Sequence, residues 1–281
     1  MELNEKQKLN LLDKAINKLA LQVGFSQGTF EDILRMENLY RMRGDLNKAL
    51  EYVKLCMEFK PEDEQVKGLH DLMSGEEINS DLGGVQPFLY LPDFLSTPLH
   101  RKLLDYVISH KEQATESKLY HGDEQKIVTP EKRLSKTLKL SNDLQAEWHS
   151  ALEKKLPDIF PRLGVEEFTP SMWEVKALLY GELAHFARHN DIQKLVTASN
   201  RFITLVYYFH NKPKRFEGGH VLLYDQNPVN GKPLEVYTRI VPEDNSFLCF
   251  YSSSFHEVTK VTLTSSSPDN GRFALVTWLH Q

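Results

Sequence analysis

One run of nine residues, Arg201 to Phe209, constrains the fold of this chain more than any other segment. It is rich in β-branched and aromatic residues, and apolar side chains stand at both odd and even positions. A strand with that pattern is buried on both faces, whereas a half-exposed strand alternates apolar and polar residues. The run therefore predicts a β-sheet that lies inside the core.

Further β-prone runs surround this one. Trp173 to Tyr180 is apolar and ends at a glycine, and residues 245–251 form another strand-like segment. Residues 216–224 are predicted as a strand in which the pair Gly218-Gly219 indicates a bulge or a close approach of the backbone. The second half of the chain is thus predicted to be mainly β.

Potential metal ligands lie at the ends of these runs. His189-Asn190-Asp191 follows the run from Trp173 to Tyr180, and His256 follows residues 245–251 after a short serine-rich turn. Two imidazoles and one carboxylate on one face of a metal leave about three coordination positions open, which is the ligand set of non-haem Fe(II) oxygenases. A second motif of the same form, His121-Gly122-Asp123, stands in a polar stretch that is typical of a solvated loop. Zinc would compete for such ligands, but structural zinc sites are closed and rich in cysteine, and the chain has two cysteines.

The order of these segments resembles the 2-oxoglutarate and Fe(II)-dependent dioxygenases, and among them the prolyl-4-hydroxylase-like branch. The matching segments cover nearly the whole second half of the chain: residues 180–191, 201–209, 216–224, 247–258 and 272–278. The resemblance implies an α+β protein with a double-stranded β-helix (jelly-roll) core, in which two antiparallel sheets form a squashed barrel with the metal at its mouth. Flanking helices and a small N-terminal α-helical unit complete the expected fold.

The resemblance also implies the cofactors. Fe(II) would be held by His189, Asp191 and His256, and 2-oxoglutarate and O2 would bind beside it, with ascorbate as a reductant. Arg272 matches the basic position that holds the far carboxylate of 2-oxoglutarate. By strand alternation its side chain shares a face with Ala274 and other small or apolar residues, and a guanidinium is suited to bidentate binding of a carboxylate.

Other residues near the expected site keep two interpretations. Tyr208 and Tyr180 match aromatic positions close to the cosubstrate, but either would equally serve as a packed core tyrosine. His185 and His220 would either touch the substrate and support the ligands or be ordinary structural histidines. Lys260 is the alternative anchor if Arg272 only pairs with a surface carboxylate. No catalytic residue beyond the metal centre is expected.

The first eighty residues are a different kind of sequence. Apolar residues recur at helical spacing in residues 3–21, 30–59 and 62–73, with a break at Gly44. The middle resembles one tetratricopeptide repeat, although Glu37 stands where a small residue is usual; the matching positions are Tyr40, Gly44, Ala49 and Pro61. We therefore expect a helical unit over residues 1–80, a linker within residues 74–86, and a dioxygenase domain over residues 81–281. The unit would bind peptides, brace the barrel or form a homodimer.

Composition limits the partners and the location. The 281 residues carry a formal net charge of −5 without a dense Lys/Arg patch, which argues against nucleic acid as a partner. No apolar run approaches the ~20 residues of a membrane span. Two cysteines far apart give no disulfide framework, which predicts a reducing, cytoplasmic location.

The function implied by the resemblance is oxidative decarboxylation of 2-oxoglutarate to succinate, coupled to hydroxylation of a C–H bond. We expect a peptidyl residue, plausibly proline, in a peptide or protein as the substrate. The alternatives are a free or carrier-bound amino acid or another small metabolite, and a non-enzymatic metal-binding interaction protein. The polar segments 111–131 and 191–200 are candidate substrate lids.

Overall fold

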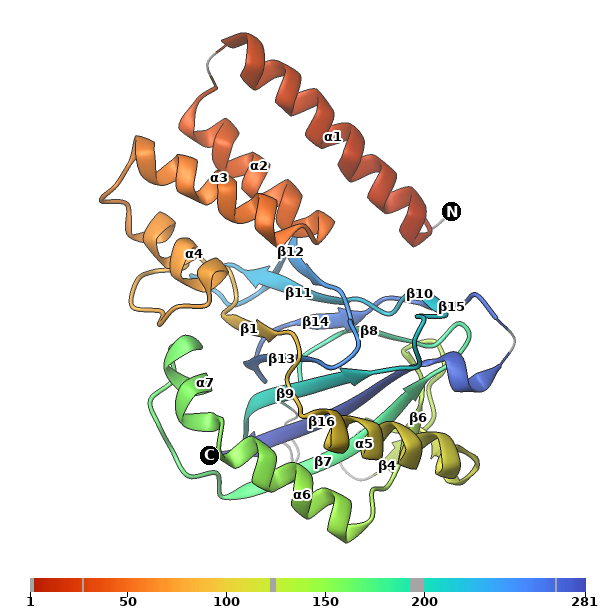
Figure 1. Cartoon of the computed structure of the whole chain (residues 1–281). Helices are drawn as coiled ribbons and strands as arrows, with labels where there is room; N and C mark the ends of the chain where they lie inside the picture. Colours follow the sequence, from red (N-terminus) through yellow and green to blue (C-terminus); the bar gives the residue numbers. More distant parts are fainter. Residues whose placement is uncertain (1–2, 27, 122–124, 193–199, 266) are drawn as a thin grey trace.

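Two facing antiparallel β-sheets form the centre of the molecule, with helices packed against them (Figure 1). The computed structural model describes residues 3–26, 28–121, 125–192, 200–265 and 267–281. The arrangement is the expected jelly roll, and the predicted α+β class is confirmed. No helix in the described ranges is long and apolar enough to cross a membrane.

The larger sheet contains the strand that the sequence predicts to be buried on both faces. Its seven strands lie in the order β1, β13, β9, β16, β7, β6, β2, and their bounds are Phe88–Leu91, Ser246–Tyr251, Arg201–Phe209, Arg272–His280, Met172–Tyr180, Lys136–Leu138 and Thr115–Glu116. The central strand β16 pairs with β9 on one side and β7 on the other. Eight of the nine residues of β9 are buried, which confirms the expectation drawn from its apolar pattern.

The smaller sheet faces the larger one and carries His189 and His256. Its five strands lie in the order β12, β11, β14, β8, β5, with bounds Pro233–Ile240, Val221–Gln226, His256–Val258, His185–His189 and Arg133–Leu134. Two short pairs lie apart from both sheets: β10 (Phe216–Gly218) with β15 (Val261–Leu263), and β3 (Leu119–His121) with β4 (Gln125–Ile127).

The glycine pair before β11 breaks a segment that the sequence predicts to be one strand. Residues 216–224 instead contribute to β10 and β11, which belong to different sheets, so that prediction was wrong. Gly218 and Gly219 have φ of 72° and 66°, a conformation that side chains disfavour and that lets the chain change sheets. A Cβ on Gly219 would stand 2.7 Å from Cδ of Arg272, so the predicted close approach of the backbone is confirmed.

Strand alternation divides the core into two layers. One face of the larger sheet packs against a helical layer of α5 (Thr97–His110), α6 (Asn142–Glu153) and α7 (Leu156–Arg162). Trp148 of α6 is fully buried there and donates from Nε1 to Oγ1 of Thr277 at 2.8 Å. The opposite face, including Val206, Ala274 and Val276, packs against the smaller sheet.

The N-terminal segment forms helices α1 (Glu5–Ser26), α2 (Phe30–Arg43), α3 (Leu46–Phe59) and α4 (Glu64–Ser74). Thr29 and Asp32 form a capping box that begins α2, and Gly44 ends it in the left-handed conformation with φ 88°. The sequence-predicted break at Gly44 is thus a helix end. Short 3₁₀ turns lie at Lys111–Gln113 and Pro268–Asn270.

A buried ionic network joins α2 to the smaller sheet. Arg41, fully buried, donates through Nη1 and Nη2 to both carboxylate oxygens of Asp225 at 2.7 Å, and its Nε donates to Glu37 at 2.9 Å. Thr238 of β12 accepts a further bond from Arg41. Glu37 therefore occupies the position where a tetratricopeptide repeat has a small residue because it helps to neutralise this buried guanidinium.

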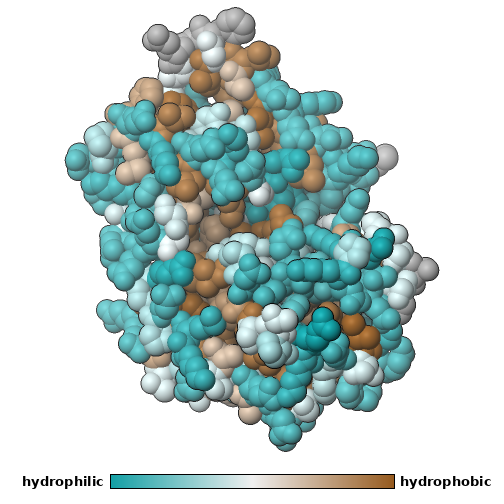
Figure 2. Space-filling model, viewed as in Figure 1, coloured by the Kyte–Doolittle hydropathy of each residue, from teal (hydrophilic) through white to brown (hydrophobic). Residues whose placement is uncertain are grey.

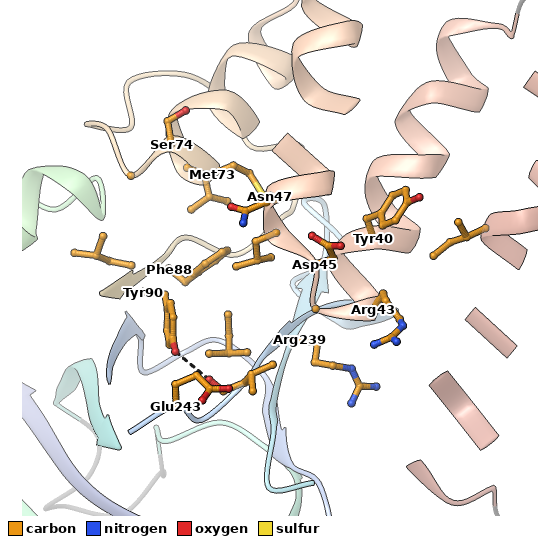
Figure 3. Close-up of a pocket in the computed structure, with 18 of the residues that line it drawn as sticks. Tyr40, Arg43, Asp45, Asn47, Met73, Ser74, Phe88, Tyr90, Arg239 and Glu243 are labelled. Carbon is orange, nitrogen blue, oxygen red and sulfur yellow. Dashed lines mark hydrogen bonds between the residues drawn. The ribbon is translucent and has the colours of Figure 1, made fainter. Parts of the chain in front are cut away.

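A wide cleft remains beside that junction, between the helices and strands β1 and β12 (Figure 3). Its volume is about 1070 Å³, and Tyr40, Arg43, Met73 and Phe88 are among the residues that line it. Figure 2 shows hydrophobic residues gathered in the hollow between the helices and the sheets, on a face that is otherwise largely hydrophilic.

Candidate metal centre

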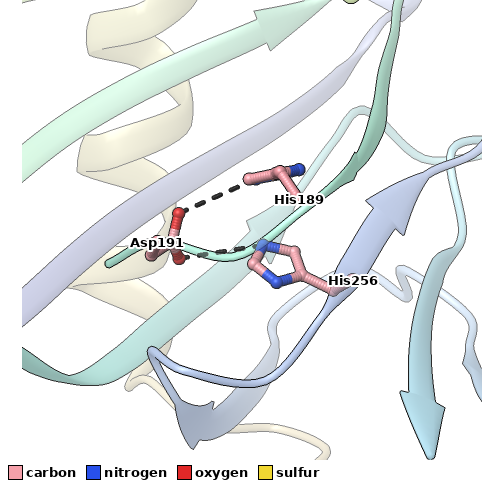
Figure 4. Close-up of side chains that lie close together, drawn as sticks. All are labelled: His189, Asp191 and His256. Carbon is pink, nitrogen blue, oxygen red and sulfur yellow. Dashed lines mark ion pairs between the residues drawn. The ribbon is translucent and has the colours of Figure 1, made fainter. Parts of the chain in front are cut away.

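His189, Asp191 and His256 come together at one end of the space between the sheets (Figure 4). His189 ends β8 and His256 begins β14, and the two residues are register partners in neighbouring strands. Asp191 follows β8, with Oδ1 3.7 Å from Nε2 of His189 and Oδ2 3.7 Å from Nε2 of His256. These separations exceed hydrogen-bond length, so three donor atoms face one point without bonding one another.

Backbone contacts fix both imidazoles in the tautomer that a metal needs. Nδ1 of His189 lies 2.8 Å from the carbonyl oxygen of Ala187, and Nδ1 of His256 lies 3.0 Å from that of Ser254. A carbonyl oxygen only accepts, so Nδ1 carries the proton in each ring. The lone pair is therefore on Nε2, the atom that faces Asp191.

The Asp191 carboxylate is positioned from the larger sheet. Thr204 of β9 donates from Oγ1 to Oδ2 of Asp191 at 2.8 Å and is itself 2.9 Å from Oγ of Ser252. The Asp191 amide donates to the Ser252 carbonyl at 2.9 Å, and Arg201 donates to the carbonyl oxygen of Asp191. These bonds turn the carboxylate toward the histidines of the opposite sheet.

The electrostatics of the site favour an ionised Asp191 beside a neutral His189. Burial, together with the adjacent imidazole of His256, lowers the pKa of His189 to about 3. Burial of Asp191 opposes its ionisation, but the adjacent histidines keep the pKa of this carboxyl below its ordinary value. Neutral nitrogens and an ionised oxygen are the protonation states in which such groups bind metal.

A cavity of about 420 Å³ connects these residues to Arg272. Arg272 is 1% exposed, and its Nε and Nη1 have no hydrogen-bond partner among the described residues. Its Cζ lies 4.5 Å from the centre of the Tyr180 ring and 4.9 Å from that of Tyr208. Tyr180 lines the cavity, whereas the buried hydroxyl of Tyr208 has no hydrogen-bond partner within the described ranges, and burial raises the pKa of this tyrosine.

This arrangement fits the implied cofactors. Two imidazole nitrogens and one carboxylate oxygen form the two-histidine, one-carboxylate set that suits Fe(II) with open positions. A buried guanidinium with unpaired N–H groups requires an anion, and a dicarboxylic acid would place a carboxylate there. Both the donor set and the unpaired arginine thus suit Fe(II) with 2-oxoglutarate.

The mouth of the cavity carries charged residues that sequence reasoning did not assign to the site. Glu174 pairs with Arg201 at 2.5 Å and also with Lys176. Trp278 lies against both cations, and its buried indole N–H is unpaired among the described residues. In the sequence, Trp278 was linked to the site only by strand alternation, which places it on the same face of β16 as Arg272.

The other sequence candidates lie elsewhere. His185 lines a different cleft and bonds the carbonyl of Leu183, and His220 lies 2.9 Å from Nη1 of Arg239 on the side of the N-terminal helices. Lys260 is exposed. Gly122 and Asp123 of the rival motif and residues 193–199 of one expected lid lie outside the described residues.

Fold and site together are those of a jelly roll with a candidate site for one metal ion. Comparison with known proteins finds a match for this part of the chain: residues 175–280 match the model of the 2OG-Fe(II) oxygenase superfamily. The matched segment includes His189, Asp191, His256 and Arg272.

A curated relative is similar in sequence, and two solved structures share the fold. An uncharacterised PKHD-type hydroxylase of Synechocystis is 32% identical over 142 residues, which are 49% of this chain and 46% of the relative. The chain thus spans about half the length of that relative. A prolyl-4-hydroxylase of Pseudomonas putida has the same fold with a TM-score of 0.51 and 18% identity, covering 70% of this chain and 94% of the other. A prolyl hydroxylase of Trichoplax adhaerens, solved with a hypoxia inducible factor peptide fragment, also has a TM-score of 0.51, with 19% identity and coverage of 70% and 84%.

Proposed function

We propose that this protein is an Fe(II)- and 2-oxoglutarate-dependent hydroxylase in which His189, Asp191 and His256 bind the metal. The observation that carries the proposal is one continuous cavity with two matched ends. Three metal-type donor atoms converge at one end, and at the other stands a buried arginine, Arg272, whose Nε and Nη1 have no partner in the described part of the chain. The family match of residues 175–280 supports the same conclusion.

The chain's own residues would hold and orient the reactants. When bound, iron and 2-oxoglutarate supply the oxidising chemistry: O2 is consumed, 2-oxoglutarate becomes succinate and CO2, and one oxygen atom is added to a C–H bond. Arg272 would bind the far carboxylate of the cosubstrate, and Tyr180 would support the guanidinium through its ring, whose centre lies 4.5 Å from Cζ of Arg272. Thr204 keeps Asp191 oriented, and the apolar wall that includes Val206 and Val276 excludes water around the cosubstrate.

For the substrate, we propose a peptidyl residue, with proline as the first candidate. The structural neighbour from Trichoplax holds a peptide fragment, which supports this choice for a protein of the same fold. A free or carrier-bound amino acid remains the second candidate, because a cavity of about 420 Å³ would accept a small molecule beside the cosubstrate.

We further propose the division into a helical unit (residues 1–80) and a dioxygenase domain (residues 81–281), with the helical unit acting as a brace. The support is the fully buried Arg41, which bonds both Glu37 of its own helix and Asp225 of the barrel. A homodimer through the helices, and ascorbate as a reductant, remain predictions.

The test is succinate release by protein loaded anaerobically with Fe(II), then exposed to air with 2-oxoglutarate and candidate substrates. Proline-containing peptides and free amino acids serve as alternative stimulants, and Asp191→Ala is the inactive control. Stimulation by peptides that depends on Asp191 would support the peptidyl hydroxylase, and stimulation by free amino acids alone would favour the second candidate. Absence of any Asp191-dependent succinate with the whole panel would count against the hydroxylase.

A further inference from the structure

Of the two arginines near the mouth of the cavity, Arg201 pairs with a glutamate, whereas Arg133 has no acidic partner in the part of the chain that the structure describes. Arg201 and Lys176 share Glu174, and Arg272 occupies the far end of the cavity. Arg133 also lines the cavity but makes no ion pair with any carboxylate that the structure describes. Its charge is therefore available to whatever enters.

The Arg133 side chain is held in place close to the metal ligands. Arg133 lies in β5 opposite Phe186 of β8, and its Cζ stands 4.6 Å from the centre of the Phe186 ring. Phe186 in turn stacks on His189 with ring centres 3.4 Å apart. A single aromatic ring thus separates the Arg133 guanidinium from a ligand of the proposed metal.

The contacts of Arg133 leave its outer edge free. Nε donates to Oγ of Ser135 at 3.0 Å, which uses the inner N–H and leaves the two terminal nitrogens without a partner among the described residues. Contact with an aromatic face and one fixed bond reduce the freedom that a guanidinium must lose on binding. Lys118, another cation of the same mouth, is exposed and presents only a flexible point charge.

We propose that Arg133 determines specificity by binding a carboxylate of the substrate. A planar pair of terminal N–H donors is suited to a bidentate bond with a carboxylate. The carboxylate would come from one of two sources: the α-carboxylate of a free amino acid, or an acidic side chain beside the oxidised residue of a peptide. This inference rests on the proposed hydroxylase function and names the chemistry of its substrate.

The test measures binding without turnover. Full-length protein is loaded with Mn(II) and 2-oxoglutarate under anaerobic conditions and titrated calorimetrically with matched probes. One pair is L-proline and L-prolinamide, and the other is the terminally blocked peptide Ala-Pro-Glu-Ala and its Ala-Pro-Gln-Ala counterpart. The variants are Arg133→Met, which keeps a side chain of similar length over Phe186, and Arg133→Lys, which keeps the charge without the planar pair of donors.

We expect an acidic probe to bind the wild-type protein more tightly than its neutral counterpart. Arg133→Met should lower the affinity for the acidic probe alone, by roughly ten- to a hundredfold. Arg133→Lys should recover only part of the loss. Lys118→Met is the matched control, because it removes one positive charge from the same mouth and should change binding far less. The pair that responds identifies the source of the carboxylate.

Other results separate this inference from the proposed function. If no acidic probe binds better than its neutral counterpart, or if Lys118→Met weakens binding as much as Arg133→Met, the inference is overturned, and Asp191-dependent succinate release would still stand. If Arg133-dependent binding of an acidic probe is found without any succinate release in air, the carboxylate site stands and the hydroxylase function fails.

Discussion

Replacing Arg272 by methionine should stabilise the protein and abolish tight binding of 2-oxoglutarate. A methionine keeps much of the side-chain length and removes a buried charge that has no acidic partner among the described residues. If Arg272 is instead a structural cation, the same substitution should destabilise the fold. The sign of the stability change therefore distinguishes the two roles.

The expected magnitudes follow from the contacts of Arg272. Two buried nitrogens without a partner cost about 1–3 kcal/mol each. Contacts with the rings of Tyr180 and Tyr208 return about 0.5–2 kcal/mol each. The difference predicts that Arg272→Met raises the free energy of unfolding by about 1–2 kcal/mol in the absence of ligand. Loss of two charge-assisted hydrogen bonds should weaken 2-oxoglutarate binding by about a hundredfold or more.

Urea unfolding of the Mn(II)-loaded protein, with and without 2-oxoglutarate, measures both effects. At a ligand concentration of one hundred times the wild-type Kd, 2-oxoglutarate should stabilise the wild type by about 2.7 kcal/mol and the variant by about 0.4 kcal/mol or less. Arg239→Met is the matched control. Arg239 is equally buried, but it donates to Glu5 and to the Met42 carbonyl. Its replacement should therefore lower the free energy of unfolding by about 3 kcal/mol.

The reasoning would be refuted by an Arg272→Met protein that unfolds more easily than the wild type and is still stabilised normally by 2-oxoglutarate. That pair of results would mean that Arg272 is satisfied within the folded chain and that the cosubstrate carboxylate is held elsewhere. Lys260, the alternative anchor, would then be the next position to replace, even though it is exposed.

Three further predictions concern the metal ligands, the junction and pH. Thr204→Val should weaken metal binding by about 10- to 100-fold because Asp191 loses its orienting hydrogen bond, and equilibrium Co(II) titration measures this; an unchanged affinity would show that Thr204 does not orient the ligand. Asp225→Asn should lower the free energy of unfolding by about 3 kcal/mol because it leaves Arg41 undercompensated, which urea unfolding checks; a loss below about 1 kcal/mol would contradict a bracing role. Burial and Arg239 lower the pKa of His220 to about 3, so the unfolded chain binds a proton there below pH 6.5 while the folded protein does not. Stability should therefore fall from pH 6.5 toward pH 3, by up to about 1.4 kcal/mol per pH unit from this residue, and His220→Gln should flatten the profile; parallel profiles would disprove the assignment.

The long buried strands of the larger sheet and the three metal-type ligands were predictable because their signals lie in local sequence. β9 begins and ends where its apolar run does, since a strand buried on both faces requires such side chains throughout. Arg272 shares a face with Ala274 and Val276 because alternation along a strand leaves no other choice. His189 and His256 were linked by the order of the strands around them, and the structure makes them register partners.

What the sequence did not predict depends on pairing between distant segments. In the sequence, Thr204 is one more β-branched residue in a buried strand. Only the folded structure brings Asp191 beside it, so that the Thr204 hydroxyl can donate a hydrogen bond to this ligand. Arg133 follows a polar segment without any apolar pattern, so nothing local indicates that β5 aligns it with Phe186. Strand register across more than fifty residues carries this information, and register is not visible in composition.

Glu37 shows how a departure from a family pattern can itself indicate a contact. A free-standing tetratricopeptide repeat gains nothing from a charged residue at a position where helices pack closely. Here that carboxylate lies beside Arg41, whose remaining donors reach Asp225 in β11, so the acid makes sense only when the helices are docked on the barrel. Burial raises the pKa of Glu37, which means that docking works against its charge and Arg41 must offset that penalty. Because these contacts link the helix to the barrel, they favour the bracing role that we propose for the helical unit.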